Sequence, residues 1–90
     1  MQTRHLLITG RVQGVGFRFY FERTARLHGV TGWVRNRRDG SIEAVIQGAD
    51  DAVSAVIGWA QRGPRSAQVA HVAVHETDGS YATFEIRDTE

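Results

Sequence analysis

The sequence predicts an α+β fold in which two amphipathic helices cover one face of a four- to five-stranded antiparallel sheet. Three observations support this prediction. Several short segments alternate apolar and polar residues, two longer segments repeat apolar residues at helical spacing, and these segments follow a β-α-β-β-α-β order. Each strand-like segment has a single apolar face, which favours helices packed on one side of an antiparallel sheet.

The first strand and the first helix are predicted from residues 4–29. The segment RHLLITGRV, residues 4–12, alternates and places on one face Leu6, Ile8, Gly10 and Val12. Side chains at helical spacing then predict a buried helix face made of Phe17, Tyr20, Phe21, Thr24 and Leu27. Gly29 suits the position just beyond the end of this helix, and Val30 is placed for the apolar contact that follows such an end.

The rest of the chain predicts a hairpin, a second helix and two more strands. TGWVRN (31–36) and SIEAVIQG (41–48) flank a turn at Asp39-Gly40. Asp50 or Asp51 is expected to cap the second helix, whose apolar stripe consists of Ala52, Val53, Val56, Ile57 and Ala60. Gly63-Pro64 ends that helix. The segments QVAHVAVHE (68–76) and YATFEIR (81–87) alternate again, the former with Ala70, Val72 and Val74 on one face.

This order of elements is the ferredoxin-like βαββαβ pattern, followed by one further strand. Its spatial strand order, four-one-three-two, brings the carboxyl ends of the first and second strands to the same edge of the sheet. Arg18 follows the first strand and Asn36 ends the second, so we expect these two residues to approach one another across the sheet. Residues 1–90 are expected to form a single domain.

Composition excludes several classes of chemistry. The chain has no cysteine, which rules out disulfides, cysteine-ligated metals and thiol catalysis. All eleven basic residues are arginine, so neither a Walker lysine nor a Schiff base is possible. The net charge of +1 argues against a dedicated nucleic-acid-binding module. No apolar run is long enough for a membrane span or a signal peptide, and the cytoplasm is the expected location.

The stretch GRVQGVGFRFY, residues 10–20, joins the first strand to a helix that has no Ser, Thr, Asp or Asn to cap it. The first turn of a helix leaves backbone amides without intrahelical partners, and glycines allow the chain to wrap closely around an anion. A bound anion would therefore serve as the cap. Taken alone, the Gly-x-Gly at residues 14–16 is also compatible with a plain tight turn, and it lacks a complete dinucleotide or P-loop motif.

Five segments, in order, resemble the acylphosphatase family: GRVQGVGFR (10–18), GVTGWVRN (29–36), DGSIE (39–43), GPRSA (63–67) and FEIR (84–87). The resemblance covers nearly the whole chain. It implies hydrolysis of a carboxyl phosphate to carboxylate and phosphate, with no metal or other cofactor. It further implies that Arg18 grips the phosphate, that Asn36 orients the attacking water, and that the phosphate is bound by backbone amides of Gln13, Gly14, Val15, Gly16 and Phe17.

The expected partners are a small acyl phosphate and inorganic phosphate, with no nucleic acid or membrane, and a monomer is expected. After Asn36 the chain departs from many relatives with Arg37 and Arg38, which we interpret either as a solvated hairpin or as residues that steer anionic substrate. His71 and His75 are placed on the open side of the sheet and are not expected to bind metal. Trp33 and Trp59 are interpreted as packing residues.

Two alternative functions are compatible with this architecture. An RNA-binding module would need the aromatic residues of GVGFRFYF on a central strand, whereas Phe17, Tyr20 and Phe21 have the spacing of a buried helix face. A carrier module would keep the phosphate site without turnover, as in the acylphosphatase-like domain of hydrogenase-maturation carbamoyltransferases. The chain starts at Met1 and shows no zinc-finger continuation, so a free-standing enzyme is expected.

Overall fold

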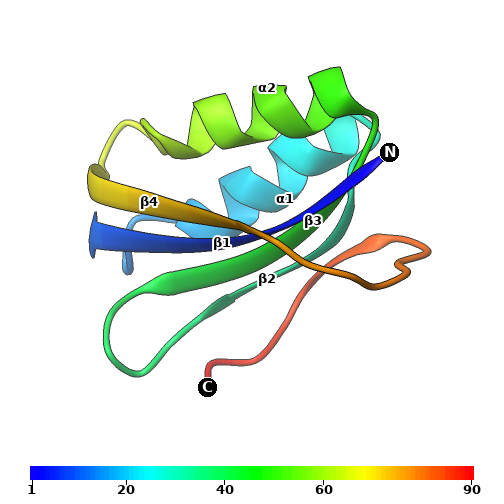
Figure 1. The fold of residues 1–90 in the computed structure, drawn as a ribbon. Helices are drawn as coiled ribbons and strands as arrows, with labels where there is room; N and C mark the ends of the chain where they lie inside the picture. The colour runs from blue at the N-terminus through cyan, green and yellow to red at the C-terminus, as the bar shows by residue number, and fades with distance from the viewer.

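The structure is a computed structural model that describes residues 1–90, and its elements follow the predicted order. These elements are β1 (Gln2–Arg11), α1 (Phe17–Leu27), β2 (Thr31–Asn36), β3 (Ile42–Gly48), α2 (Asp50–Ala60), β4 (Gln68–Glu76) and β5 (Phe84–Ile86). Figure 1 shows both helices on one face of the sheet, with no helix on the other. The predicted ferredoxin-like α+β fold is confirmed.

The sheet has five strands in the order β4-β1-β3-β2-β5, and its first four strands are antiparallel. The prediction of an antiparallel sheet is wrong for β5, which runs parallel to β2. The chain leaves β4 at the end of the sheet where β2 begins, and residues 77–83 carry it across to the opposite edge (Figure 1). The Gln47 side chain holds this crossing segment, since it donates to the Gly79 carbonyl and accepts from the Tyr81 amide.

The core lies between the helices and the sheet. Its largest fully buried side chains come from both layers: Phe17, Phe21, Phe84, Leu6, Ile8, Ile42, Ile46, Val12, Val34, Val53 and Val56. On α1 the buried positions are Phe17, Phe21 and Ala25, a spacing of four residues. The predicted burial of Tyr20 and Leu27 is wrong: both are exposed, Leu27 by 81%. Only a narrow stripe of this helix therefore contacts the sheet.

The ends of the helices differ from one another. At the end of α1 the Gly29 amide donates to Arg26 and the Val30 amide donates to Ala25, so the predicted glycine stop is a Schellman motif. At the start of α2 the N-cap residue is Ala49, and no side chain caps the helix. The predicted Asp cap is therefore wrong. Asp50 and Asp51 lie instead in the first turn, where negative charge interacts favourably with the helix dipole.

Strand β4 departs from regular pairing where it meets the end of β1. The register shifts between Thr9 and Gly10, so that Gly10 pairs with Val69. A β carbon on Gly10 would lie 2.3 Å from the Gln68 carbonyl oxygen, and only glycine allows this approach. Because of the shift, Val69 packs against the core and Ala70 is exposed, contrary to the prediction from simple alternation. Val74 pairs with Leu6 in the regular part of the ladder, on the predicted face, and is 39% exposed because β4 is an edge strand.

The open face of the sheet carries a charged and aromatic cluster. Two guanidinium groups lie over the ring of Trp33, those of Arg35 at 4.9 Å and Arg87 at 4.7 Å from the ring centre. Trp59 packs edge-on against Phe17 and Phe21 on the other side. Both tryptophans are thus packing residues, although Trp33 stands outside the main core. Neither helix has the length and apolar character needed to cross a membrane.

Candidate active site

The loop of residues 13–16 connects β1 to α1 and leaves its backbone amides free. Gly14 and Gly16 have φ values of 74° and 78°, in the left-handed region that favours glycine. Gly16 is the N-cap of α1, and no side chain caps the helix, as predicted. No amide of residues 13–16 donates a hydrogen bond to the rest of the chain. These donors, together with the first turn of α1, can bind an anion.

Arg18 is the second residue of α1 and supplies an unpaired guanidinium beside this loop. Ion pairs engage other arginines of the chain, namely Arg4, Arg26, Arg35, Arg37 and Arg87, and Arg18 takes part in none. A guanidinium presents a planar fork of donors that can hold two oxygens of one phosphoryl group. The Arg18 charge is therefore not neutralised by a carboxylate of the protein and is available to a ligand.

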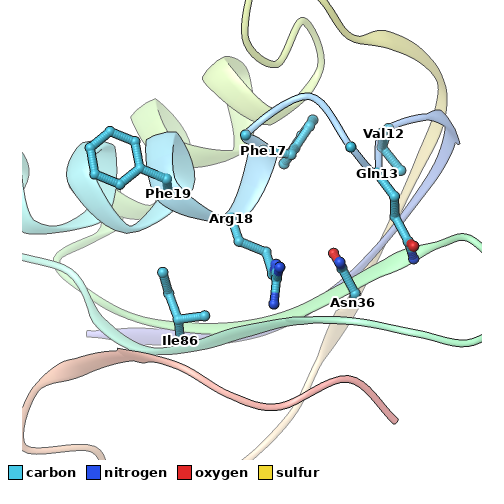
Figure 2. A pocket seen from close by; sticks show the side chains of 9 residues that line it. Val12, Gln13, Phe17, Arg18, Phe19, Asn36 and Ile86 are labelled. Atoms are coloured by element: carbon cyan, nitrogen blue, oxygen red, sulfur yellow. The ribbon is translucent and has the colours of Figure 1, made fainter.

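Asn36 is the last residue of β2 and pairs with Ile42, a core residue, on the helix-covered face of the sheet. Its side chain and that of Arg18 point into the same pocket (Figure 2). The pocket has a volume of about 260 Å³ and is lined by Val12, Gln13, Gly14, Gly16, Phe17, Arg18, Phe19, Asn36 and Ile86. The strand order β1-β3-β2 thus brings together two residues eighteen positions apart in the sequence, as we expected.

Gln13 contributes more than the backbone amide that the sequence suggested. Its side-chain nitrogen donates to the carbonyl oxygens of Arg37, at 2.7 Å, and Ser41, at 2.9 Å. These carbonyls belong to the turn that immediately follows Asn36. The side chain therefore ties the amide loop to the hairpin that carries Asn36, a contact that no local sequence pattern indicates.

Two apolar residues, one in the loop and one at the start of α1, anchor the loop to the core. Phe17 is buried and packs edge-on against Trp59, with ring centres 5.3 Å apart. Gly63 lies so close to this ring that a β carbon there would meet the ring at 2.5 Å. Val15 does not line the pocket, and its side chain packs against the core instead. Val15 can therefore contribute to phosphate binding through its backbone amide but not through its side chain.

The two arginines after Asn36 have different surroundings. The Arg37 guanidinium is 3.1 Å from Glu43, which also contacts His5 at 2.7 Å and Arg35 at 2.7 Å. Burial raises the pKa of Glu43, but the hydrogen bonds from His5 and Arg35, the charge of Arg35 and the Arg37 contact outweigh it and hold the pKa below the ordinary value. Arg38 is exposed and forms no ion pair, so of the two it is the better candidate for substrate steering.

The histidines of β4 lie away from the pocket. His71 and His75 pair with Thr9 and His5 across the open face of the sheet. The rings of His5 and His75 are 6.4 Å apart. No group of three or more His, Cys, Asp or Glu side chains in the chain could hold a metal ion.

Comparison with known proteins identifies the family. A sequence model of the acylphosphatase family matches residues 4–86. The chain belongs to the acylphosphatase family. An acylphosphatase of Thiobacillus denitrificans is 56% identical to it over 87 residues, which cover 97% of this chain and 98% of that protein. The prediction of an acylphosphatase is therefore confirmed.

Solved structures agree with this assignment. The crystal structure of an acylphosphatase from Bacillus subtilis has a TM-score of 0.92 at 30% identity and covers 97% of this chain and 99% of that one. Full-length HypF, solved in a phosphate- and nucleotide-bound form, has a TM-score of 0.87 at 28% identity. That match covers 98% of this chain but 12% of the HypF chain. The same fold thus also occurs as a small part of a much longer protein.

Proposed function

We propose that this acylphosphatase holds the phosphoryl group of its substrate with the backbone amides of residues 13–17 and with Arg18, while Asn36 orients the attacking water. The observation that carries this proposal is the convergence in one pocket of three features: an uncapped helix start, an unpaired guanidinium and an unpaired side-chain amide. The proposed reaction needs no metal ion or other cofactor.

The chemistry of the substrate explains why so few groups suffice. Phosphoryl transfer requires mainly positioning and stabilisation of negative charge on the equatorial oxygens. The loop amides and the Arg18 guanidinium supply donors and positive charge for these oxygens. The left-handed conformation of Gly14 and Gly16 is one that glycine adopts without strain.

The leaving group and the water place different demands on the site. Carboxylic acids have pKa values of about 4, so a carboxylate leaves without a strong general acid. An amide side chain cannot remove a proton near neutral pH, but its oxygen can accept a hydrogen bond from water and aim the water at phosphorus. Asn36 is therefore assigned a positioning contact with the nucleophile rather than the role of a base.

Substrate selectivity tests this mechanism. We expect rapid hydrolysis of acetyl phosphate in the presence of EDTA and very slow hydrolysis of p-nitrophenyl phosphate or a sugar phosphate, because these monoesters release poorer leaving groups. The measurement is phosphate release from each substrate by the same preparation, with and without EDTA. Comparable rates for acyl phosphate and monoester, or complete loss of activity in EDTA, would contradict the proposal.

The same fold occurs within HypF, which was solved with phosphate and nucleotide bound, and this likeness motivates one alternative: a module that binds phosphate without turning substrate over. The same assay separates the two functions. Inactive protein that still binds inorganic phosphate would support the alternative, whereas turnover of acetyl phosphate excludes it. A single domain over residues 1–90, a monomer, a cytoplasmic location and the absence of nucleic-acid or membrane partners stay predictions.

A further inference from the structure

The pocket extends beyond the phosphate-binding groups to two exposed apolar side chains. Phe19 and Ile86 line it together with Arg18 and Asn36. Phe19 is 56% exposed and Ile86 is 40% exposed, so each retains free apolar surface. We call this pair the apolar rim. Neither side chain has a part in the hydrolysis mechanism described above.

The rim is built from both layers of the fold. Phe19 lies on α1 directly after Arg18, and its ring packs edge-on against Tyr20 with centres 5.2 Å apart. Ile86 lies on β5, where it pairs with Val34 and shares the helix-covered face of the sheet. The two side chains therefore flank the same end of the pocket from the helix layer and from the sheet layer.

The geometry of the reaction relates the rim to the substrate. In phosphoryl transfer the attacking and leaving oxygens lie roughly in line on opposite sides of phosphorus. Figure 2 shows Arg18 in the middle of the pocket, with Asn36 on one side of it and Phe19 and Ile86 on the other. If Asn36 aims the water, the leaving acyl group departs away from Asn36, toward the apolar rim.

We propose that the apolar rim binds the acyl group of the substrate, so that the enzyme prefers acyl phosphates with longer apolar chains over acetyl phosphate. This inference rests on the proposed function. Phe19 and Ile86 are then specificity-determining residues that touch the part of the substrate beyond the reacting atoms. The substrate class that it names is the phosphates of apolar carboxylic acids.

The expected preference is modest because the rim covers only one side of the acyl chain. A fully buried methylene raises affinity about fourfold, and a chain lying on an open surface buries only part of each methylene. We therefore expect kcat/KM to rise about tenfold from acetyl to hexanoyl phosphate. Straight-chain carboxylates differ little as leaving groups, so this rise reports contact rather than chemical reactivity.

The test is kcat/KM for acetyl, butyryl and hexanoyl phosphate in wild type and in the Phe19→Gln/Ile86→Thr double variant. Glutamine is a better helix former than phenylalanine, and threonine keeps the β-branching suited to a strand. The matched control is Leu27→Gln, which removes another exposed apolar residue from the same helix but not from the pocket. Inhibition by inorganic phosphate reports whether the phosphate site survives.

The proposal predicts a tenfold rise with chain length in wild type and in Leu27→Gln, and a nearly flat series in the double variant. In each single variant, Phe19→Gln or Ile86→Thr, the rise of kcat/KM with chain length should be about half as steep. A flat series in wild type, or an unchanged slope in the double variant, would overturn the inference while leaving the proposed function intact. Failure to hydrolyse any of the three substrates would instead overturn the proposed function. The rise of kcat/KM with chain length compares substrates within one variant, so it tests the proposal even in a variant whose overall activity is lower.

Discussion

Gly14 and Gly16 hold the loop between β1 and α1 in the left-handed conformation that leaves its amides free for a ligand. At the opposite end of α1, Gly29 has nearly the same φ value, 70°, in a Schellman motif far along the helix from the pocket. Both Gly16 and Gly29 leave room for a β carbon, with no atom closer than 3.4 Å at Gly16 and none within 4 Å at Gly29. The two positions thus make the same demand on the backbone, but only Gly16 lines the pocket.

Alanine substitutions at these two glycines separate the effect of backbone strain on stability from an effect on catalysis. We predict that Gly16→Ala and Gly29→Ala each lower the free energy of unfolding by about 1–2 kcal/mol, because a residue with a β carbon is strained at positive φ. Only Gly16→Ala should also lower kcat/KM, by about 10- to 100-fold, because it displaces the loop amides. Thermal unfolding and acetyl phosphate kinetics check both. Equal activity in the two variants would mean that the Gly16 backbone has no part in phosphate binding.

Individual residues of the site differ in how far the sequence could place them. Arg18 and Asn36 were predicted from the family motif, and the strand order of the fold explained their meeting. The side-chain contacts of Gln13 could not be predicted, because its acceptors are carbonyl groups that only the folded hairpin presents. The apolar rim was missed for the same reason, since Phe19 and Ile86 meet only across the two layers.

At the level of the secondary-structure elements, strand β3 carries the only buried acidic residue on the open face of the sheet. Glu43 is 9% exposed and receives contacts from His5 on β1, Arg35 on β2 and Arg37 in the following turn. These contacts lower its pKa from the ordinary value of 4.5 in spite of burial. The ionised carboxylate therefore holds three neighbouring segments together, including the strand that ends at Asn36.

Because the folded-state pKa of Glu43 is depressed, its ionisation stabilises the protein fully above about pH 4.5 and less as the pH falls through the lower folded value. We predict that Glu43→Gln lowers the free energy of unfolding at pH 7 by about 1–2 kcal/mol. This loss corresponds to a fall of about 5–15 °C in the midpoint of thermal unfolding. The difference from wild type should shrink at about pH 3.

The matched control for this prediction is Glu76→Gln, whose carboxylate is 87% exposed and lies 3.7 Å from Arg4. An exposed pair contributes little, so its midpoint should barely change at either pH. Thermal unfolding of the three proteins at both pH values makes the comparison. A difference between wild type and Glu43→Gln that stayed constant from pH 7 to pH 3 would show that ionisation of Glu43 does not stabilise the fold.

The boundaries of several elements followed from local pattern, whereas features set by distant contacts did not. The strands at 31–36 and 68–76 and the helix at 17–27 were placed from alternation, spacing and the Gly29 stop. The parallel direction of β5 depends on where β4 ends, and the register shift at Gly10 depends on its approach to Gln68. Simple alternation contains neither piece of information.

At the scale of the whole molecule, the sheet order brings the end of β2 to the pocket formed by the loop that follows β1, and so assembles one site from two separate segments of the chain. In the proposed mechanism each segment has its own step: the loop and Arg18 bind the phosphoryl group, and Asn36 aims the water. Substitution in one segment should therefore leave the function of the other measurable.

The most direct test is the steady-state hydrolysis of benzoyl phosphate by wild type, Arg18→Ala and Asn36→Ala, with inorganic phosphate as a competitive inhibitor. We predict that kcat/KM falls about 100-fold or more in both variants. The inhibition constant for phosphate should weaken in Arg18→Ala and stay near the wild-type value in Asn36→Ala, whose loss should appear in kcat. An Asn36→Ala variant with wild-type kcat, or an Arg18→Ala variant that binds phosphate as tightly as wild type, would contradict the account.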